Sequence, residues 1–219
     1  MYRQVLRISS AFSQPFRQAL VSTSARHFQS TMAASAATRV SDSIMHDHAE
    51  LKDYYNNIKK VTRDDDKIKW QNQFVWELAR HSIAEELVVY PVFEKHIPNG
   101  LKMAEKDRTE HQQVKDKLYE FQSMSPSDAN FDPTIDSLWE ALSQHILEEE
   151  RDDLPALEEM INSDASSALA RSFDRTKHFV PTRSHPSAPD RPPYETAVGL
   201  MTAPMDKFKD MFRSFPEAK

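Results

Sequence analysis

Histidine and glutamate recur in register in two separate segments of the chain. "HSIAEELVVYPVFE" runs from His81 to Glu94, and "HILEEERDDLPALE" runs from His145 to Glu158. In both segments glutamate follows the histidine after four and five residues, proline after ten and glutamate again after thirteen. Imidazole and carboxylate groups are common ligands of transition metals. The chain has no cysteine, so any metal site must be built from these groups.

The repeat extends to a second pair of segments. "DHAELK", residues 47–52, matches "EHQQVK", residues 110–115, at an offset of 63. The repeated unit is therefore a pair of helices, present twice. A pseudo-two-fold axis between the two pairs would bring equivalent positions together in the middle of a bundle. The positions that would meet there are His48, His81, Glu85, His111, His145 and Glu149.

These six polar side chains lie on helical stripes that are otherwise made of Leu, Ile, Val and Phe. Burying a carboxylate or an imidazole without a partner is unfavourable by several kcal/mol. His and Glu at i and i+4 are separated by roughly 40° around a helix, so both point to one place. A single inward histidine is more often an ordinary core residue, but six on convergent stripes favour a metal centre. A helical scaffold with a metal-free His–Glu network is the alternative.

Two neighbouring histidines compete for the first helix. His46 shares its helical face with polar residues, whereas His48 shares its face with apolar ones. The repeat also aligns His48, and not His46, with His111. We therefore assign His48 to the site. Glu86 and Glu150 lie about 100° beyond the assigned glutamates, and we expect them to face solvent or to support the ligands.

The donor set restricts the metal. Six nitrogen and oxygen ligands are too many for one tetrahedral zinc ion, and imidazoles exclude an oxygen-only calcium site. Mixed imidazole and carboxylate ligation suits iron or manganese. Two ions, each with two His and sharing two carboxylates, would use all six residues and leave positions for water, an oxo or hydroxo bridge, or a small gas. Ferritin-like sites use mostly Glu with Glu-x-x-His, which is the reverse of the pattern here.

Four amphipathic helices must position these residues. Glycine occurs only 2 times in 219 residues, and helix-forming residues are abundant. Apolar residues recur at helical spacing over residues 41–61, 66–95, 101–124 and 134–163. "IPNG" at 97–100 and the loop at 125–133 separate the later helices. The sequence therefore predicts an all-α, up-down-up-down four-helix bundle over residues 41–163.

The chain resembles the hemerythrin-like, HHE cation-binding domain over about residues 41–163. The resemblance lies in the order of the predicted ligands, which is His48, His81-x-x-x-Glu85, His111 and His145-x-x-x-Glu149. The "YP" at 90–91 and "LP" at 154–155 are also similar to the family's pattern, and we expect each proline to bend or end its helix. The resemblance implies that the six residues are ligands of two iron ions, with Glu85 and Glu149 as bridges.

The chain departs from the oxygen-carrying hemerythrins at two positions. Lys115 and Glu150 stand where those proteins have His and Asp, so the site resembles the sensor and repair branches. The resemblance implies a di-iron protein that binds or senses iron, oxygen or nitric oxide. The alternative is an enzyme-like member that repairs iron–sulfur clusters or reduces nitric oxide or peroxide. We expect Lys115 to be a surface lysine, with pairing to a carboxylate as the alternative.

The two ends of the chain differ from the bundle in composition. Residues 1–31 contain arginines and serines but no acid, which is typical of a mitochondrial transit peptide and predicts location in the matrix. Met32 could start a cytoplasmic form without this segment. The whole chain carries −6 and the first 41 residues carry five arginines, so residues 42–219 carry −11, which argues against nucleic-acid binding. No segment has the ~20 apolar residues of a membrane span.

The segment 164–219 is predicted to be a Pro-rich linker followed by a short amphipathic helix. We expect this helix to begin at Pro204 and to dock on the bundle, with a protein partner or a membrane surface as the alternative. Its apolar face would comprise Met205, Phe208, Met211, Phe212 and Phe215.

Overall fold

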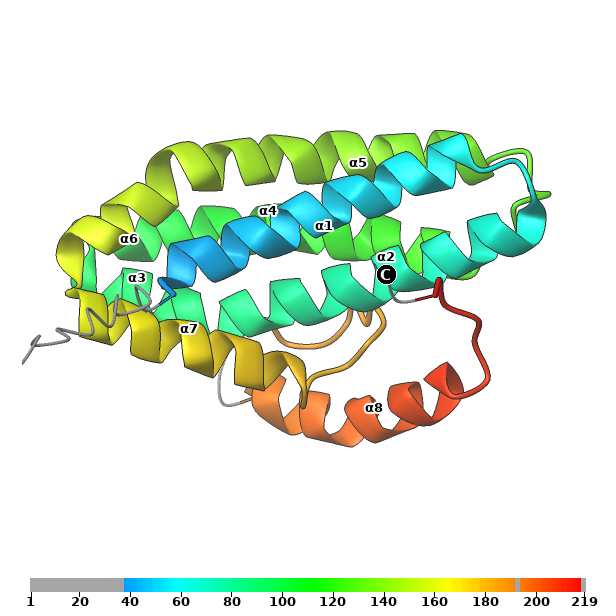
Figure 1. The fold of residues 1–219 in the computed structure, drawn as a ribbon. Coiled ribbons are helices and arrows are strands. Elements are labelled where there is room, and N and C mark those ends of the chain that lie inside the picture. Colours follow the sequence, from blue (N-terminus) through cyan, green and yellow to red (C-terminus); the bar gives the residue numbers. More distant parts are fainter. Residues whose placement is uncertain (1–37, 192–193, 218–219) are drawn as a thin grey trace, which may run out of the picture. The chain divides into compact units, whose positions relative to one another are not determined.

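The regular secondary structure of the described residues consists only of helices. A computed structural model describes residues 38–191 and 194–217 (Figure 1). Over these ranges the chain forms helices and no strand, which confirms the predicted all-α class. The predicted transit peptide, residues 1–31, lies outside the described residues. No helix within these ranges is both long and apolar enough to cross a membrane.

Four helical rods joined by short connections form the bundle (Figure 1). The first rod is α1 (Val40–Lys60) and the third is α4 (Gly100–Phe121). The second rod consists of α2 (Asp64–Ala84), η1 (Glu85–Val89) and α3 (Tyr90–His96). The fourth consists of α5 (Phe131–Glu148), η2 (Glu149–Asp153) and α6 (Leu154–Met160). Each observed end lies within three residues of the predicted one.

Both long rods contain a π-helical turn, η1 and η2, that begins at a predicted glutamate ligand. The N–H of Tyr90 donates to the carbonyl of Glu85, five residues earlier, and the N–H of Leu154 donates to that of Glu149. The next residue in each rod is proline, which has no N–H and would clash with the preceding turn of a regular α-helix. The wider turn accommodates the proline, so each rod continues beyond the site instead of ending there.

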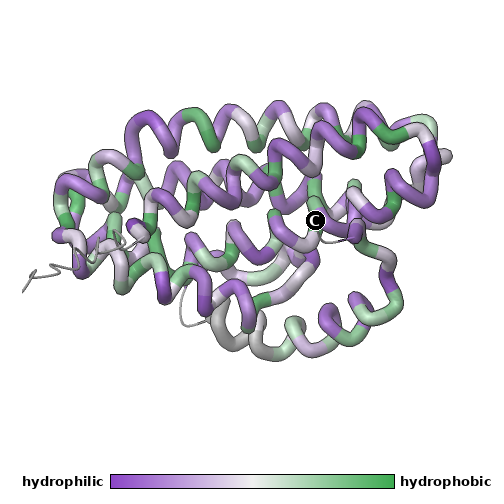
Figure 2. The backbone as a smooth tube through the Cα atoms, viewed as in Figure 1, coloured by the Kyte–Doolittle hydropathy of each residue, from purple (hydrophilic) through white to green (hydrophobic). Residues whose placement is uncertain are grey.

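Two apolar clusters fill the bundle on either side of a polar layer. One cluster contains Leu51 and Phe74, and the other contains Ile44 and Phe93. Along each rod the predicted ligands fall between residues of the two clusters. Figure 2 shows hydrophilic and hydrophobic positions alternating along the helices, as amphipathic helices require. Each fully buried aliphatic or aromatic side chain stabilises the fold by roughly 1.5–3 kcal/mol, so the two clusters hold the polar layer in place.

The tight connection before α4 depends on two residues. Asn99 adopts a left-handed conformation with a φ of 62°. A Cβ atom at Gly100 would collide with the backbone carbonyl of Phe93, so only glycine fits where α4 begins against the end of α3.

The sequence pattern does not predict α7 (Ser163–Lys177). The side chain of Asn162 caps this helix by accepting a hydrogen bond from the N–H of Ala165 at 2.9 Å. Its buried face consists mainly of small residues around Phe173, so the apolar periodicity is weak. The helix contacts α1, α2 and η1 and therefore covers one side of the bundle (Figure 1).

The C-terminal helix α8 (Tyr194–Asp210) is longer than predicted, and Pro204 lies inside it. The predicted docking is wrong for most of the apolar face, because Met205, Phe208, Met211 and Phe212 are 62%, 63%, 78% and 77% exposed. Only Phe215 of the predicted face packs against the bundle, edge-on to Trp76 of α2 with ring centroids 6.5 Å apart. The helix is instead held through its polar side. Asp206 accepts a hydrogen bond from His185 at 2.8 Å, and Thr182 donates to Asp210 at 2.6 Å.

Candidate metal centre

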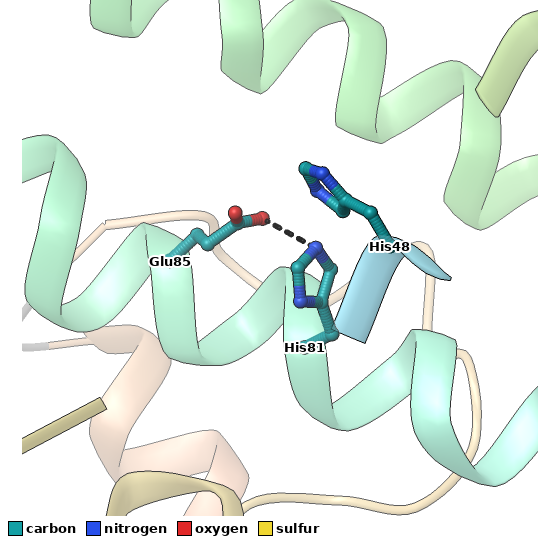
Figure 3. Close-up of side chains that lie close together, drawn as sticks. All are labelled: His48, His81 and Glu85. Carbon is teal, nitrogen blue, oxygen red and sulfur yellow. Dashed lines mark ion pairs between the residues drawn. The ribbon is translucent and has the colours of Figure 1, made fainter. Parts of the chain in front are cut away.

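The bundle brings all six predicted ligands together, and none is more than 3% exposed. Helix α1 provides His48, α2 provides His81 and α4 provides His111. Helix α5 provides His145, and the glutamates Glu85 and Glu149 are the first residues of η1 and η2. Figure 3 shows the side chains of His48, His81 and Glu85 converging from two helices.

The four histidines form two pairs with nearly the same geometry. The ring centroids of His48 and His81 are 4.9 Å apart, and those of His111 and His145 are 4.7 Å apart. The interplanar angles are 70° and 69°. This agreement follows from the repeat, since the two pairs occupy equivalent positions of the two helix pairs.

Each glutamate reaches one histidine of each pair. Glu85 Oε2 lies 3.3 Å from His81 Nε2 and 3.5 Å from His111 Nε2. Glu149 Oε2 lies 3.4 Å from His48 Nε2 and 3.8 Å from His145 Nε2. The two carboxylates therefore lie between the histidine pairs.

A second carboxylate lies behind every histidine. In the first histidine pair, Nδ1 of His48 lies 2.9 Å from Glu150 and Nδ1 of His81 lies 3.2 Å from Asp47. In the second pair, Nδ1 of His111 lies 3.0 Å from Glu86 and Nδ1 of His145 lies 2.9 Å from Glu110. We call these four acids the outer carboxylates. Each outer carboxylate accepts a hydrogen bond from Nδ1–H, so the proton is held on the outer nitrogen and the lone pair of Nε2 points inward. This is the tautomer in which imidazole binds a metal.

The outer carboxylates were only partly predictable. The supporting role that we considered for Glu86 and Glu150 is the one the structure gives them. No role was predicted for Asp47 and Glu110, although they begin the matching segments "DHAELK" and "EHQQVK". An acid retained at equivalent positions of a repeat was the signal that could have identified them.

Three lysines accompany the outer carboxylates. Lys115 Nζ lies 2.5 Å from Glu86, Lys177 Nζ from α7 lies 2.5 Å from Asp47, and Lys106 Nζ lies 3.0 Å from Glu110. Lys115 is only 8% exposed, so the expectation of a surface lysine is wrong and the alternative of a carboxylate pair is confirmed. These ammonium groups keep the outer carboxylates ionised, which strengthens their hold on the imidazoles.

The central atoms leave hydrogen-bonding capacity that a cation would satisfy. Both carboxylate oxygens of Glu85, both of Glu149 and Nε2 of His48 are buried without a hydrogen-bond partner among the described residues. A neutral imidazole that carries its proton on Nδ1 has no proton on Nε2 to donate to the glutamates. Buried carboxylates without donors are strongly unfavourable. The residues present therefore fit a metal site of imidazole nitrogens and carboxylate oxygens.

The buried charges perturb one another strongly. Burial and the neighbouring charge of Glu149 raise the pKa of Glu85 well above its ordinary value. Burial lowers the pKa values of His81 and His111, which favours the neutral imidazole that a metal binds. Burial alone would also lower the pKa of His48, but its interactions with the carboxylates of Glu149 and Glu150 outweigh burial and raise the pKa to about 9.

A phenol distinguishes the second histidine pair from the first. The hydroxyl of Tyr90 lies 3.0 Å from His111 Nε2, which is itself 3.1 Å from His145 Nε2. Tyr90 is fully buried, and burial raises its pKa well above the ordinary value, so the hydroxyl stays protonated. The equivalent residue in the repeat is Leu154, which has no polar group.

The structure also separates the two competing histidines. The side chain of His46 is 72% exposed, and its Nε2 atom lies 3.9 Å from Glu50. His48, two residues later on α1, points into the polar layer. The choice of His48 is therefore consistent with the geometry of the site.

Known proteins are similar to this chain in sequence and in fold. Residues 39–157 match the family described as Hemerythrin HHE cation binding domain. An uncharacterized hemerythrin-like protein of Schizosaccharomyces pombe is 55% identical over 180 residues, covering 82% of this chain and 89% of that protein. The crystal structure of a Hemerythrin HHE cation binding domain-containing protein from Mycobacterium kansasii has a TM-score of 0.56 at 22% identity and covers 64% of this chain and 86% of its own. The chain belongs to the hemerythrin HHE cation-binding family.

Proposed function

We propose that the polar layer holds two iron ions and that the protein binds or senses a small ligand there. The observation that carries this proposal is the position of Glu85 and Glu149. Each lies between the two histidine pairs, and each has two buried oxygens without a hydrogen-bond partner among the described residues.

The roles of the residues follow from their distances. His48 and His81 with Glu85 offer donor atoms within 4.8 Å of one another, and so do Glu85, His111 and His145. Glu85 belongs to both groups and is assigned as a bridge, as is Glu149 from its own contacts. Mixed nitrogen and oxygen ligation favours iron, and manganese is the alternative.

When bound, iron would supply redox-active positions that can take up dioxygen or nitric oxide. The protein's own residues orient and protect that position. The outer carboxylates fix the imidazole tautomers, and the two apolar clusters exclude bulk water from the layer. Labile iron is itself a candidate ligand, in which case the protein would report iron availability.

The Tyr90 hydroxyl favours a second candidate function, the reduction of nitric oxide or peroxide. Reduction of either ligand consumes protons, whereas simple binding does not. Tyr90 places a protonated hydroxyl 3.0 Å from His111 Nε2, inside the layer. A turnover assay with nitric oxide or hydrogen peroxide and an electron donor separates this candidate from a binding protein.

The full chain, purified and loaded with ferrous iron without oxygen, tests the proposal. We expect elemental analysis to find iron, and oxidation to produce near-ultraviolet absorption that shifts when azide is added. Neither iron nor manganese in the loaded protein would contradict the proposal. Mitochondrial import is a separate proposal from the composition of residues 1–31, and a fluorescent reporter fused to residues 1–40 that stays in the cytosol would contradict it.

A further inference from the structure

Asp107 lies beside the second histidine pair, and Asp153 lies close enough to Asp107 for its charge to help burial raise the pKa of Asp107 to about 8. Neither residue has a role in the site described so far. Asp107 on α4 is 0% exposed, and neither of its carboxylate oxygens has a hydrogen-bond partner in the part of the chain described. Asp153, in η2, is 7% exposed. A buried carboxylate left without a donor is unfavourable, so these residues need a physical explanation.

The aspartates lie between the surface and the centre. Donor atoms of Asp107, Glu110 and His145 all lie within 4.8 Å of one another. Glu110 and Glu148 form the outer edge, where their side chains are 27% and 26% exposed. Acidic side chains therefore extend from solvent to the second histidine pair.

The ammonium group of Lys106 lies at this outer edge. Lys106 Nζ lies 2.7 Å from Glu148, 3.0 Å from Glu110 and 3.9 Å from Asp107. The last distance is too long for a hydrogen bond, so Asp107 lacks a donor even with the lysine nearby. Half of the Lys106 side chain is exposed, at 47%, so it can move away when another cation arrives.

The other half of the repeat lacks these acids. The residues equivalent to Asp107 and Asp153 are Ile44 and Val89, and both are fully buried. The fold therefore accepts hydrocarbon at these positions, and packing alone does not call for acids there. The outer carboxylates of that half, Asp47 and Glu86, are also buried, at 2% and 0% exposure.

We propose that Asp107, Glu110 and Asp153 form a further cation site, through which divalent iron or manganese passes from solvent to the centre. This inference rests on the proposed function, because it assumes that the centre takes up metal. Carboxylate oxygens suit a partly hydrated divalent ion, and an incoming ion would displace the ammonium of Lys106.

Metal uptake by the full-length metal-free chain tests the site. Under anaerobic conditions with ferrous iron, Asp107→Asn and Asp153→Asn should load about tenfold more slowly, because a cleft of one charge sign speeds association by at least that factor. Both variants should still reach the final metal content of the unaltered chain. Lys106→Gln should load faster. Glu120→Gln, an exposed acid on α4 outside this cluster, is the matched control and should load at the normal rate.

A second measurement keeps the inference separate from the centre itself. Titration with Mn²⁺ should show one weak ion per chain beyond those of the centre, and Asp107→Asn should lack it. The variants Asp107→Ile and Asp153→Val, which take the residues of the other half, should fold and load as slowly as the Asn variants. Unchanged loading rates and an unchanged Mn²⁺ count in the Asp107 and Asp153 variants would overturn this site but leave the centre standing. An unaltered chain that binds no metal at all would overturn both.

Discussion

The two helix pairs of the bundle provide the same predicted ligands but surround them differently. Each pair contributes two histidines, one central glutamate, a π-helical turn and a proline two residues after the end of that turn. The repeat therefore retains the side chains that would hold the ions and the π-helical backbone that orients them. The residues one turn away differ, as Ile44 against Asp107 and Tyr90 against Leu154 illustrate.

The cover over the site differs between the two helix pairs. Helix α7 contacts α1, α2 and η1, and its Lys177 lies 2.5 Å from Asp47. On the second helix pair, the side chains of Glu110 and Glu150 are 27% and 33% exposed. Glu110 supports His145, whereas Glu150 supports His48 of the first pair, so each histidine pair has one buried and one partly exposed outer carboxylate.

The largest effect should come from removing a histidine from either half. His81→Ala and His145→Ala should both lose metal and melt at a lower temperature, because a ligand present at 100 times its Kd stabilises the fold by about 2.7 kcal/mol. Elemental analysis and thermal melting of the loaded proteins check this. His46→Ala is the control and should keep its metal. Metal loss in His46→Ala, together with retention in His48→Ala, would contradict the ligand assignment.

The outer carboxylates should show an intermediate effect that differs between the halves. Asp47→Asn and Glu110→Gln should weaken metal binding by roughly 10- to 100-fold, because each carboxylate holds a histidine in its binding orientation. We expect the larger loss for Asp47, which is buried, than for the partly exposed Glu110. Competition with a chelator of known affinity measures both. Equal or reversed losses would contradict the stronger support that we expect from the buried carboxylate.

The fold and the six central residues could be predicted from the sequence because both depend on periodicity. Apolar residues at helical spacing predicted the four helical rods. The polar residues that recur among them, at equivalent positions of the repeat, indicated the site. The polarity of the helical face and the alignment of the repeat both favoured His48 over His46.

Features that depend on contacts between helices could not be predicted in the same way. Asp47 lies next to a ligand in sequence but supports His81 on another helix. Lys177 reaches the site from α7, whose small buried residues give a weak apolar pattern. The exposed apolar face of α8 shows the converse, since an amphipathic pattern predicts a buried face but does not guarantee one.

Tyr90→Phe tests the asymmetry between Tyr90 and Leu154. The variant should keep its metal and lose about 1 kcal/mol of stability with the hydrogen bond. If Tyr90 supplies protons at the centre, nitric oxide or peroxide turnover should fall while azide binding persists. Unchanged turnover would remove the support that Tyr90 gives to the enzymatic candidate.

The smallest effect should come from the equivalent glutamates at the ends of the two long rods. Glu158 accepts hydrogen bonds from Ser41 Oγ at 2.7 Å and Ser166 Oγ at 2.9 Å, and Glu94 lies 2.6 Å from Arg108. Burial opposes ionisation of Glu158, but these serine hydrogen bonds prevail and lower its pKa below the ordinary 4.5. Glu158→Gln and Glu94→Gln should each lower the unfolding free energy by about 1 kcal/mol at pH 7.

The pH dependence of the Glu158 variant has a definite sign. A carboxyl with a lowered pKa in the folded state stabilises the protein above its unfolded pKa, and this contribution disappears on acidification. The difference between the unaltered chain and Glu158→Gln should therefore be complete near neutral pH and shrink as the pH falls below 4.5. Chemical denaturation at several pH values measures it, and a difference that grows in acid would contradict the assignment.

Anomalous diffraction from crystals of the iron-loaded full chain, recorded at the iron edge, would locate the proposed ions. We expect two anomalous peaks per chain, one beside His48 and His81 and one beside His111 and His145, with Glu85 and Glu149 between them. A single peak, or peaks away from these residues, would contradict the proposal.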